Sequence, residues 1–128
     1  MLKESARVRQ ISGEPRRRWF SSPTLDLYVW SDEAGAAVGF QLCYGLGSDE
    51  RALTWTAPDV FSHASIDDGE GRSFRHKGTP IMRSGRGFDA GAVAALFAAE
   101  NAELPHGIAE LVSAKIAEYG RRARKRPR

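Results

Sequence analysis

The chain of 128 residues contains almost no cysteine and no long apolar run. Its single cysteine, Cys43, excludes an intramolecular disulfide, and a chain without such bonds fits the reducing cytoplasm. No apolar run approaches the ~20 residues that a membrane-spanning helix needs. Residues 1–5 lack the apolar stretch of a secretory signal. These absences predict a cytoplasmic protein with no membrane segment.

The sequence also lacks the strong motifs of catalysis, metal binding and nucleotide binding. It contains no H-E-x-x-H pair and no phosphate-binding loop with its lysine. Cys43 lies in the middle of an expected strand, beside no basic residue, which favours a packing role over a nucleophilic one. We therefore expect no cofactor and no catalytic residue, and a binding function is favoured over an enzymatic one.

One expected turn nevertheless collects side chains that bind metal ions. His63 and His76 flank Asp67 and Asp68, and a hairpin here would bring the two histidines onto facing strands. One or two carboxylates would then complete a site for a divalent metal. The sequence Asp-Asp-Gly-Glu is also an ordinary turn. A solvated turn with two surface histidines is the favoured interpretation, and a metal-binding hairpin is the alternative.

Charge is distributed unevenly along the chain. Residues 1–18 carry a net charge of +4 and residues 120–128 carry +6, whereas residues 19–119 carry −7, which together give the net +3. We predict a basic N-terminal arm over 1–18, a single domain over 19–119 and a basic tail over 120–128. An acidic domain is a poor match for nucleic acid, so contact with a polyanion is expected only at the two ends.

The basic ends contain the candidate residues for such contact. In the N-terminal arm, arginines stand next to Trp19 and Phe20, which could stack on bases. The alternative is that the charged ends keep the protein soluble and bind nothing. The candidate polyanion-binding residues are Arg16, Arg17, Arg18, Arg121, Arg122, Arg124, Lys125 and Arg126.

The most regular pattern in the chain predicts a β-hairpin. Apolar residues alternate with polar or aromatic ones over 25–30 and again over 37–43. A four-residue loop over 32–35, with Gly35 in the left-handed conformation, sets the register. The predicted pairs are Leu25 with Leu42, Leu27 with Phe40 and Val29 with Val38, all on one face. A third strand over 51–56 is predicted to pair Tyr44 with Leu53 and Leu42 with Trp55.

The opposite side of this sheet, the second face, carries the candidate binding residues Tyr28, Trp30 and Gln41. In the predicted register Tyr28 stands opposite Gly39 and Trp30 opposite Ala37, so both rings can lie flat over the neighbouring strand. These side chains could contact a ligand or a partner protein. The alternative is that helices or further strands cover them.

The rest of the chain predicts more strands and then helices. Residues 60–66 and 72–77 read as strands, and residues 79–82 as a short edge strand. Asp89 caps a helix over about 90–102, whose apolar stripe is Val93, Leu96 and Phe97. A second helix follows Pro105 and ends at Gly120. The predicted fold is therefore α+β, an antiparallel meander of about five strands followed by two C-terminal helices packed on one face.

Three segments resemble small bacterial proteins of an uncharacterised family. They are Leu25-Asp26-Leu27-Tyr28-Val29-Trp30, Gly39-Phe40-Gln41-Leu42-Cys43-Tyr44 and Glu50-Arg51-Ala52-Leu53-Thr54-Trp55. The resemblance extends over about residues 17–89. No activity is assigned to that family, so the resemblance implies no site residue, cofactor or partner.

The leading hypothesis from the sequence is a non-enzymatic interaction or accessory protein. It would bind its partner through an exposed face or edge of the sheet, and a second copy of the chain is one candidate, which would make a homodimer. Two alternatives remain. One is a weak nucleic-acid or polyanion binder that uses the basic ends, and the other is a metal-dependent enzyme or metal-binding hairpin around His63 and His76.

Overall fold

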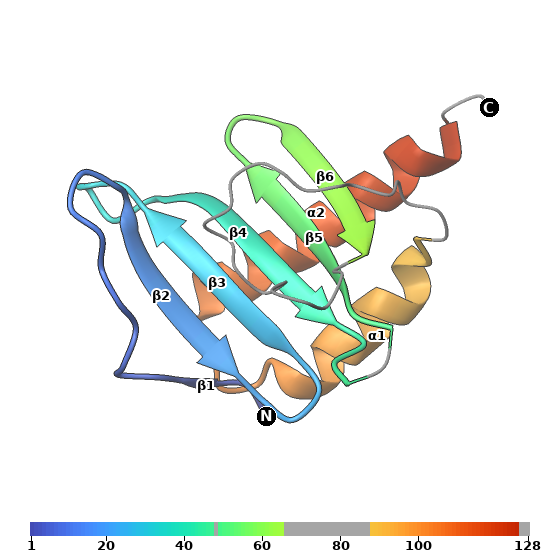
Figure 1. The fold of residues 1–128 in the computed structure, drawn as a ribbon. Helices are drawn as coiled ribbons and strands as arrows, with labels where there is room; N and C mark the ends of the chain where they lie inside the picture. Colours follow the sequence, from blue (N-terminus) through green and yellow to red (C-terminus); the bar gives the residue numbers. More distant parts are fainter. Residues whose placement is uncertain (48, 66–87, 126–128) are drawn as a thin grey trace.

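The computed structural model describes residues 1–47, 49–65 and 88–125. Within these ranges the fold is α+β, as predicted: an antiparallel sheet whose six strands follow each other in chain order, and then two helices (Figure 1). The strands are β1 (Lys3–Glu4), β2 (Arg16–Ser21), β3 (Asp26–Ser31), β4 (Ala37–Tyr44), β5 (Arg51–Thr56) and β6 (Val60–Ser65), and the helices are α1 (Ala90–Glu100) and α2 (His106–Lys125). The strands predicted over 72–77 and 79–82 lie outside the described residues.

Both helices pack on the same side of the sheet, which we call the helix-side face (Figure 1). The strand residues that point to this side alternate with those that point away, as a half-buried antiparallel sheet requires. Each large apolar side chain buried here contributes about 1.5–3 kcal/mol. The most deeply buried of these side chains are Phe20, Leu27, Val29, Phe40, Leu42 and Leu53 of the sheet, and Phe97, Val112 and Ile116 of the helices.

Two details of the predicted helices are wrong. Leu96, which the sequence places in the apolar stripe of α1, has 39% of its surface exposed, whereas its neighbours Val93 and Phe97 are buried as predicted. The predicted cap at Asp89 is confirmed, because its side chain accepts a hydrogen bond from the backbone nitrogen of Ala92 at 3.0 Å. Neither helix, over the residues described, is both long enough and apolar enough to span a bilayer. The second wrong detail is the predicted end of α2 at Gly120.

The register predicted for the hairpin is wrong by two residues. Leu27 pairs with Leu42 and Val29 pairs with Phe40. Because side chains alternate with a period of two, this shift keeps the apolar residues on their predicted face. Strands β4 and β5 also pair two residues from the predicted register, with Leu42 opposite Leu53 and Phe40 opposite Trp55. Trp55 is buried on the helix-side face, as predicted.

The turn between β3 and β4 explains the shift in the hairpin. The loop has one more residue than predicted, because Ser31 pairs with Ala37 rather than with Ala36. The Asp32 carboxylate holds this loop by accepting hydrogen bonds from the backbone nitrogens of Ala34 and Ala36. A β-bulge next to Ser31 then adds the second residue of the shift.

The N-terminal residues are part of the fold rather than an arm. Residues 16–18 lie in β2, which pairs with β3 along its whole length. The backbone nitrogen of Leu2 donates to the carbonyl of Glu100 at 2.9 Å, and the Leu2 side chain is fully buried in the core. The predicted boundary after residue 18 therefore does not separate an arm from the domain. The expected count of about five strands misses β1 and β2 for the same reason.

The predicted end of α2 at Gly120 is also wrong, because the helix continues to Lys125. Gly120 is buried where α2 crosses α1, and a Cβ atom built on it would lie only 2.5 Å from the Cβ of Ala90. Glycine is therefore present at position 120 because the two helix backbones approach each other closely. The segment predicted as a basic tail begins inside this helix.

Substituting the two glycines of α2 separates helix propensity from packing. Alanine favours helix at either position, but a Cβ at Gly107 meets no atom within 4 Å, whereas one at Gly120 overlaps Ala90. We expect Gly120→Ala to be less stable than Gly107→Ala by about 1–3 kcal/mol. Urea unfolding of the two variants measures this difference. Equal midpoints would mean that the helices do not meet at Gly120.

Candidate functional site

The second face of the sheet brings together residues from three adjacent strands. Arg17 pairs with Trp30, and Trp19 pairs with Tyr28, across β2 and β3. Tyr28 in turn pairs with Gln41 on β4. Directly paired residues of antiparallel strands project to the same side. The three candidate binding residues predicted from the sequence therefore share one face with Arg17 and Trp19, on the side of the sheet opposite the two helices.

The aromatic side chains of this face are ordered by contacts with the sheet. The rings of Trp19 and Tyr28 are parallel within 2°, with centroids 5.8 Å apart. The indole nitrogen of Trp19 donates a hydrogen bond to the Asp26 carboxylate at 3.1 Å. The predicted register set Trp30 opposite Ala37, but the shift of two residues places it opposite Gly39. The Trp30 ring lies 3.8 Å from where a Cβ of Gly39 would stand. All three aromatic side chains are half-buried.

Sequence reasoning missed Arg17 and Trp19 as members of this face. The positive net charge of residues 1–18 suggested an arm. A weaker signal for a strand was the length of six residues between Pro15 and the turn at Ser22 and Pro23. The Arg17 guanidinium lies 3.7 Å from the Glu14 carboxylate. Its Nε is buried and has no hydrogen-bond partner within the described ranges.

The side-chain amide of Gln10 protects the outer edge of β2 beside Arg17. The amide nitrogen of Gln10 donates to the Arg17 carbonyl at 2.8 Å, and its oxygen accepts from the Arg17 backbone nitrogen at 2.9 Å. The backbone nitrogen of Ser5 donates to the Trp19 carbonyl. The segment between β1 and β2 thus provides hydrogen-bond partners for backbone groups at the outer edge of β2, which limits pairing with another chain there.

The predicted polyanion-binding arginines do not form one group. Arg18 projects to the helix-side face, where its guanidinium makes two hydrogen bonds of 2.8 Å to Glu4 and lies 5.3 Å from the centre of the Phe20 ring. The hydrogen bond from Arg18 lowers the pKa of Glu4. Arg16 and Arg121 are exposed. Arg124 and Lys125 lie in the last turn of α2, and Arg126 lies outside the described residues.

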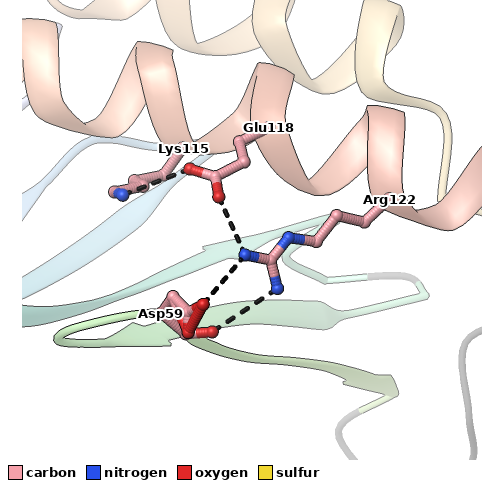
Figure 2. Close-up of polar contacts among 4 residues, drawn as sticks. All are labelled: Asp59, Lys115, Glu118 and Arg122. Atoms are coloured by element: carbon pink, nitrogen blue, oxygen red, sulfur yellow. Dashed lines mark hydrogen bonds and ion pairs between the residues drawn. The ribbon is translucent and has the colours of Figure 1, made fainter.

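Arg122 joins the end of α2 to the turn between β5 and β6 (Figure 2). Its guanidinium lies 3.3 Å from the Asp59 carboxylate and 2.9 Å from that of Glu118, and it covers the Phe61 ring at 5.0 Å. Glu118 also binds Lys115 at 3.2 Å, and hydrogen bonds from Lys115 and Arg122 lower the pKa of its carboxyl. Arg122 therefore has a structural role, because two carboxylates already neutralise it.

His63 is a core residue and not the surface histidine that the sequence suggested. It is 4% exposed, and its Nε2 shares a hydrogen bond of 2.5 Å with the hydroxyl of Tyr44. Phe88 packs edge-on against the imidazole, with ring centroids 4.9 Å apart. Burial among these rings lowers the pKa of His63 to about 4, and burial raises the pKa of Tyr44 to about 12. Both groups are therefore neutral at neutral pH.

The other metal candidates, Asp67, Asp68 and His76, lie outside the described residues. Within the parts of the chain that the structure describes, no three His, Cys, Asp or Glu side chains gather as metal ligands. His63 is not a surface residue beside a turn because of its place in the sheet. It pairs with Leu53 across β5 and β6, so its side chain points toward the helices and away from the second face.

Comparisons with known proteins assign no family to the chain. No protein-family model matches it, and no curated protein and no solved structure matches it significantly.

Proposed function

We propose that this protein is a non-enzymatic binding protein and that the second face of its sheet is the surface that contacts the partner. The observation that carries this proposal is the convergence of Trp19, Tyr28 and Trp30 with Arg17 and Gln41 on the side of the sheet away from the helices. Tryptophan, tyrosine and arginine are the side chains that contribute most often to binding energy at protein surfaces.

The rigidity of this face supports a binding role. A contact that must first be ordered loses part of its free energy to the side-chain entropy of the free protein. Here the Trp19 ring is already held by Asp26 and Tyr28, and the Trp30 ring already lies against the backbone at Gly39. These rings therefore lose little side-chain entropy when a partner binds.

Site-specific photocrosslinking in the native host tests the proposal, because it captures whichever molecule contacts the labelled position. Thr56 is exposed and stands in the same cross-strand row as Trp30 and Gly39. A benzophenone amino acid at position 56 should form adducts that are absent when the same group replaces Ser113, an exposed residue of α2. An adduct with the mass of two chains would identify a homodimer as the bound state.

Two results would contradict the proposal. One is the absence of any adduct from position 56, and the other is an equal yield of the same adducts from positions 56 and 113. The crosslinking variants must first match the unsubstituted protein in circular dichroism and in thermal midpoint, so that an unfolded surface is not mistaken for a binding face.

A further inference from the structure

We propose that the C-terminal end of α2 is a separate interaction surface, which binds the phosphate backbone of double-stranded nucleic acid without reading its sequence. This surface is distinct from the second face of the sheet, so the proposal does not rest on the proposed function. Residues 120–128 contain six Lys or Arg and no acid. Because α2 continues to Lys125, most of this basic segment belongs to a helix with a defined outer face.

Three of the basic positions lie on the side of α2 that faces away from the core. Val112 is fully buried, and Arg121 follows it by nine residues, which is two and a half helical turns. Arg121 is therefore on the opposite side of the helix, and it is exposed. Arg124 and Lys125 follow Arg121 by three and four residues, the spacing of neighbours on one helix face. The end of α2 extends beyond the edge of the sheet (Figure 1), so this face stands clear of the acidic domain.

Arg121 differs from its neighbour Arg122 in having no counter-ion among the described residues. The Arg122 guanidinium is held toward the sheet by the carboxylates of Asp59 and Glu118 (Figure 2). Arg121 forms no ion pair with a described carboxylate. The preceding acid on the outer face of the helix, Glu110, is eleven residues earlier, about 16 Å along the axis. This separation exceeds the Debye length of about 8 Å at physiological ionic strength. The charge of Arg121 is therefore available to a partner.

The helix dipole explains only part of this positive charge. The partial negative charge at the C-terminal end of a helix stabilises cations within its last turn. Here the basic residues begin before the last turn, at Arg121, and continue in the sequence after Lys125, at Arg126 and Arg128. A row of cations of this length complements a row of anions, and a nucleic-acid duplex carries one negative charge per about 1.7 Å of its axis.

The composition of this helix face favours a duplex over an anionic membrane or a single strand. A helix that lies on a bilayer inserts large apolar side chains such as Trp, Phe or Leu. The exposed residues of α2 before Arg121 are instead small, and they include Ser113, Ala114 and Ala117, whereas its large apolar side chains pack against the core. No aromatic residue follows Tyr119, so this end of the chain offers no ring on which an unpaired base could stack. Contact with phosphates alone is therefore expected, and a duplex presents them most densely.

Two exposed arginines at opposite ends of the chain provide a matched test. Fluorescence anisotropy of a short labelled DNA duplex measures binding to the full chain as a function of salt. Arg121→Gln and Arg7→Gln remove the same charge from exposed positions, and glutamine preserves helix propensity at position 121. We expect Arg121→Gln to weaken binding and to lower the slope of log affinity against log salt by about 0.9, the loss of one phosphate contact, with the slope unchanged in Arg7→Gln. The triple variant Arg121→Gln/Arg124→Gln/Lys125→Gln should lower this slope by about 2.7.

Four outcomes would overturn the proposal. The first two are the absence of binding by the unsubstituted protein at low salt and an equal change of slope in Arg121→Gln and Arg7→Gln. The other two are tighter binding to phosphatidylcholine vesicles that contain phosphatidylserine, and tighter binding to a single strand of the same length as the duplex. Thermal midpoints are measured alongside, because a role limited to the helix dipole would lower the midpoint of Arg121→Gln and leave its salt slope unchanged, which also contradicts the proposal.

Discussion

Replacing Leu2 with alanine is expected to lower the free energy of unfolding by about 2–5 kcal/mol. Such a loss is unusual for the second residue of a chain, since terminal segments are usually poorly ordered. Leu2 is fully buried in the core, in contact with side chains of the sheet and the helices. Its truncation removes apolar contact and leaves a cavity where the surrounding side chains are already packed.

The backbone around Leu2 cannot relax easily into that cavity. The nitrogen of Leu2 is bound to the carbonyl of Glu100 at the end of α1, and the terminal amine lies 3.0 Å from the Glu100 carboxylate. Strand β1 follows immediately and pairs with β2. The N-terminus is thus held by a backbone hydrogen bond, by an ion pair and by the pairing of β1 with β2. We therefore expect the loss for Leu2→Ala to lie in the upper part of the range of about 2–5 kcal/mol.

Ile11 provides the matched control for Leu2→Ala. It belongs to the same N-terminal segment but is 37% exposed, so Ile11→Ala should change stability by no more than about 0.5 kcal/mol. Urea unfolding followed by tryptophan fluorescence measures both variants. Similar midpoints for Leu2→Ala and the unsubstituted protein would show that residues 1–4 are an arm after all.

Acidification is expected to destabilise the protein through His63. Its pKa is about 4 in the folded protein, mainly because burial disfavours the charged imidazole, and about 6.5 when the chain is unfolded. The unfolded chain therefore binds a proton first as the pH falls. The stabilisation that comes from the neutral imidazole is complete above pH 6.5 and is lost progressively between about pH 6.5 and 4.

The size of this effect follows from the same two pKa values. Between about pH 7.5 and 4.5 the single site should lower the free energy of unfolding by about 2–3 kcal/mol. The positive charge of Arg51 also opposes protonation, and the uncharged rings of Phe88 and Tyr119 pack against the imidazole. Carboxylates whose pKa values are lowered, such as Glu4 and Glu118, add their own acid sensitivity.

A variant that does not titrate isolates the contribution of His63. His63→Phe keeps an aromatic ring of similar shape and leaves the Tyr44 hydroxyl without its partner, so it should be less stable at neutral pH. Between about pH 7.5 and 4.5, the free energy of unfolding of this variant should nevertheless fall by about 2–3 kcal/mol less than that of the unsubstituted protein. His106→Gln, at an exposed position of α2, is the control. Parallel curves for His63→Phe and the unsubstituted protein would refute the assignment.

The candidate face was partly predictable from local alternation. The spacing of Tyr28 and Trp30 placed both rings on one side of a strand, and a register error of two residues could not move them, because it preserves the face. Arg17 and Trp19 were missed because pairing between β2 and β3 depends on where the chain turns back at residues 22–25. The local charge suggested a different structure for this segment.

His63 illustrates a separate limit of sequence reasoning. Its place in the strand over 60–66 is predicted correctly, but a short turn rich in acids makes it look like a surface ligand. Its burial follows from the position of Phe88 and Tyr119, which are distant in the sequence and reach it only when the helices fold back onto the sheet. No pattern within β6 contains that information.

Sequence alone determined the α+β class, three central strands, the cap at Asp89 and the division of the sheet into an apolar and an aromatic face. These features depend on periodicity and on local hydrogen bonding, which are encoded within a few neighbouring residues. Tertiary structure alone decided that Leu2 completes the core, that Gly120 lies at a helix crossing and that Arg17 stands beside Trp30. These contacts join residues far apart in the chain, and their energies exceed the local preferences that favoured an arm and an early helix end.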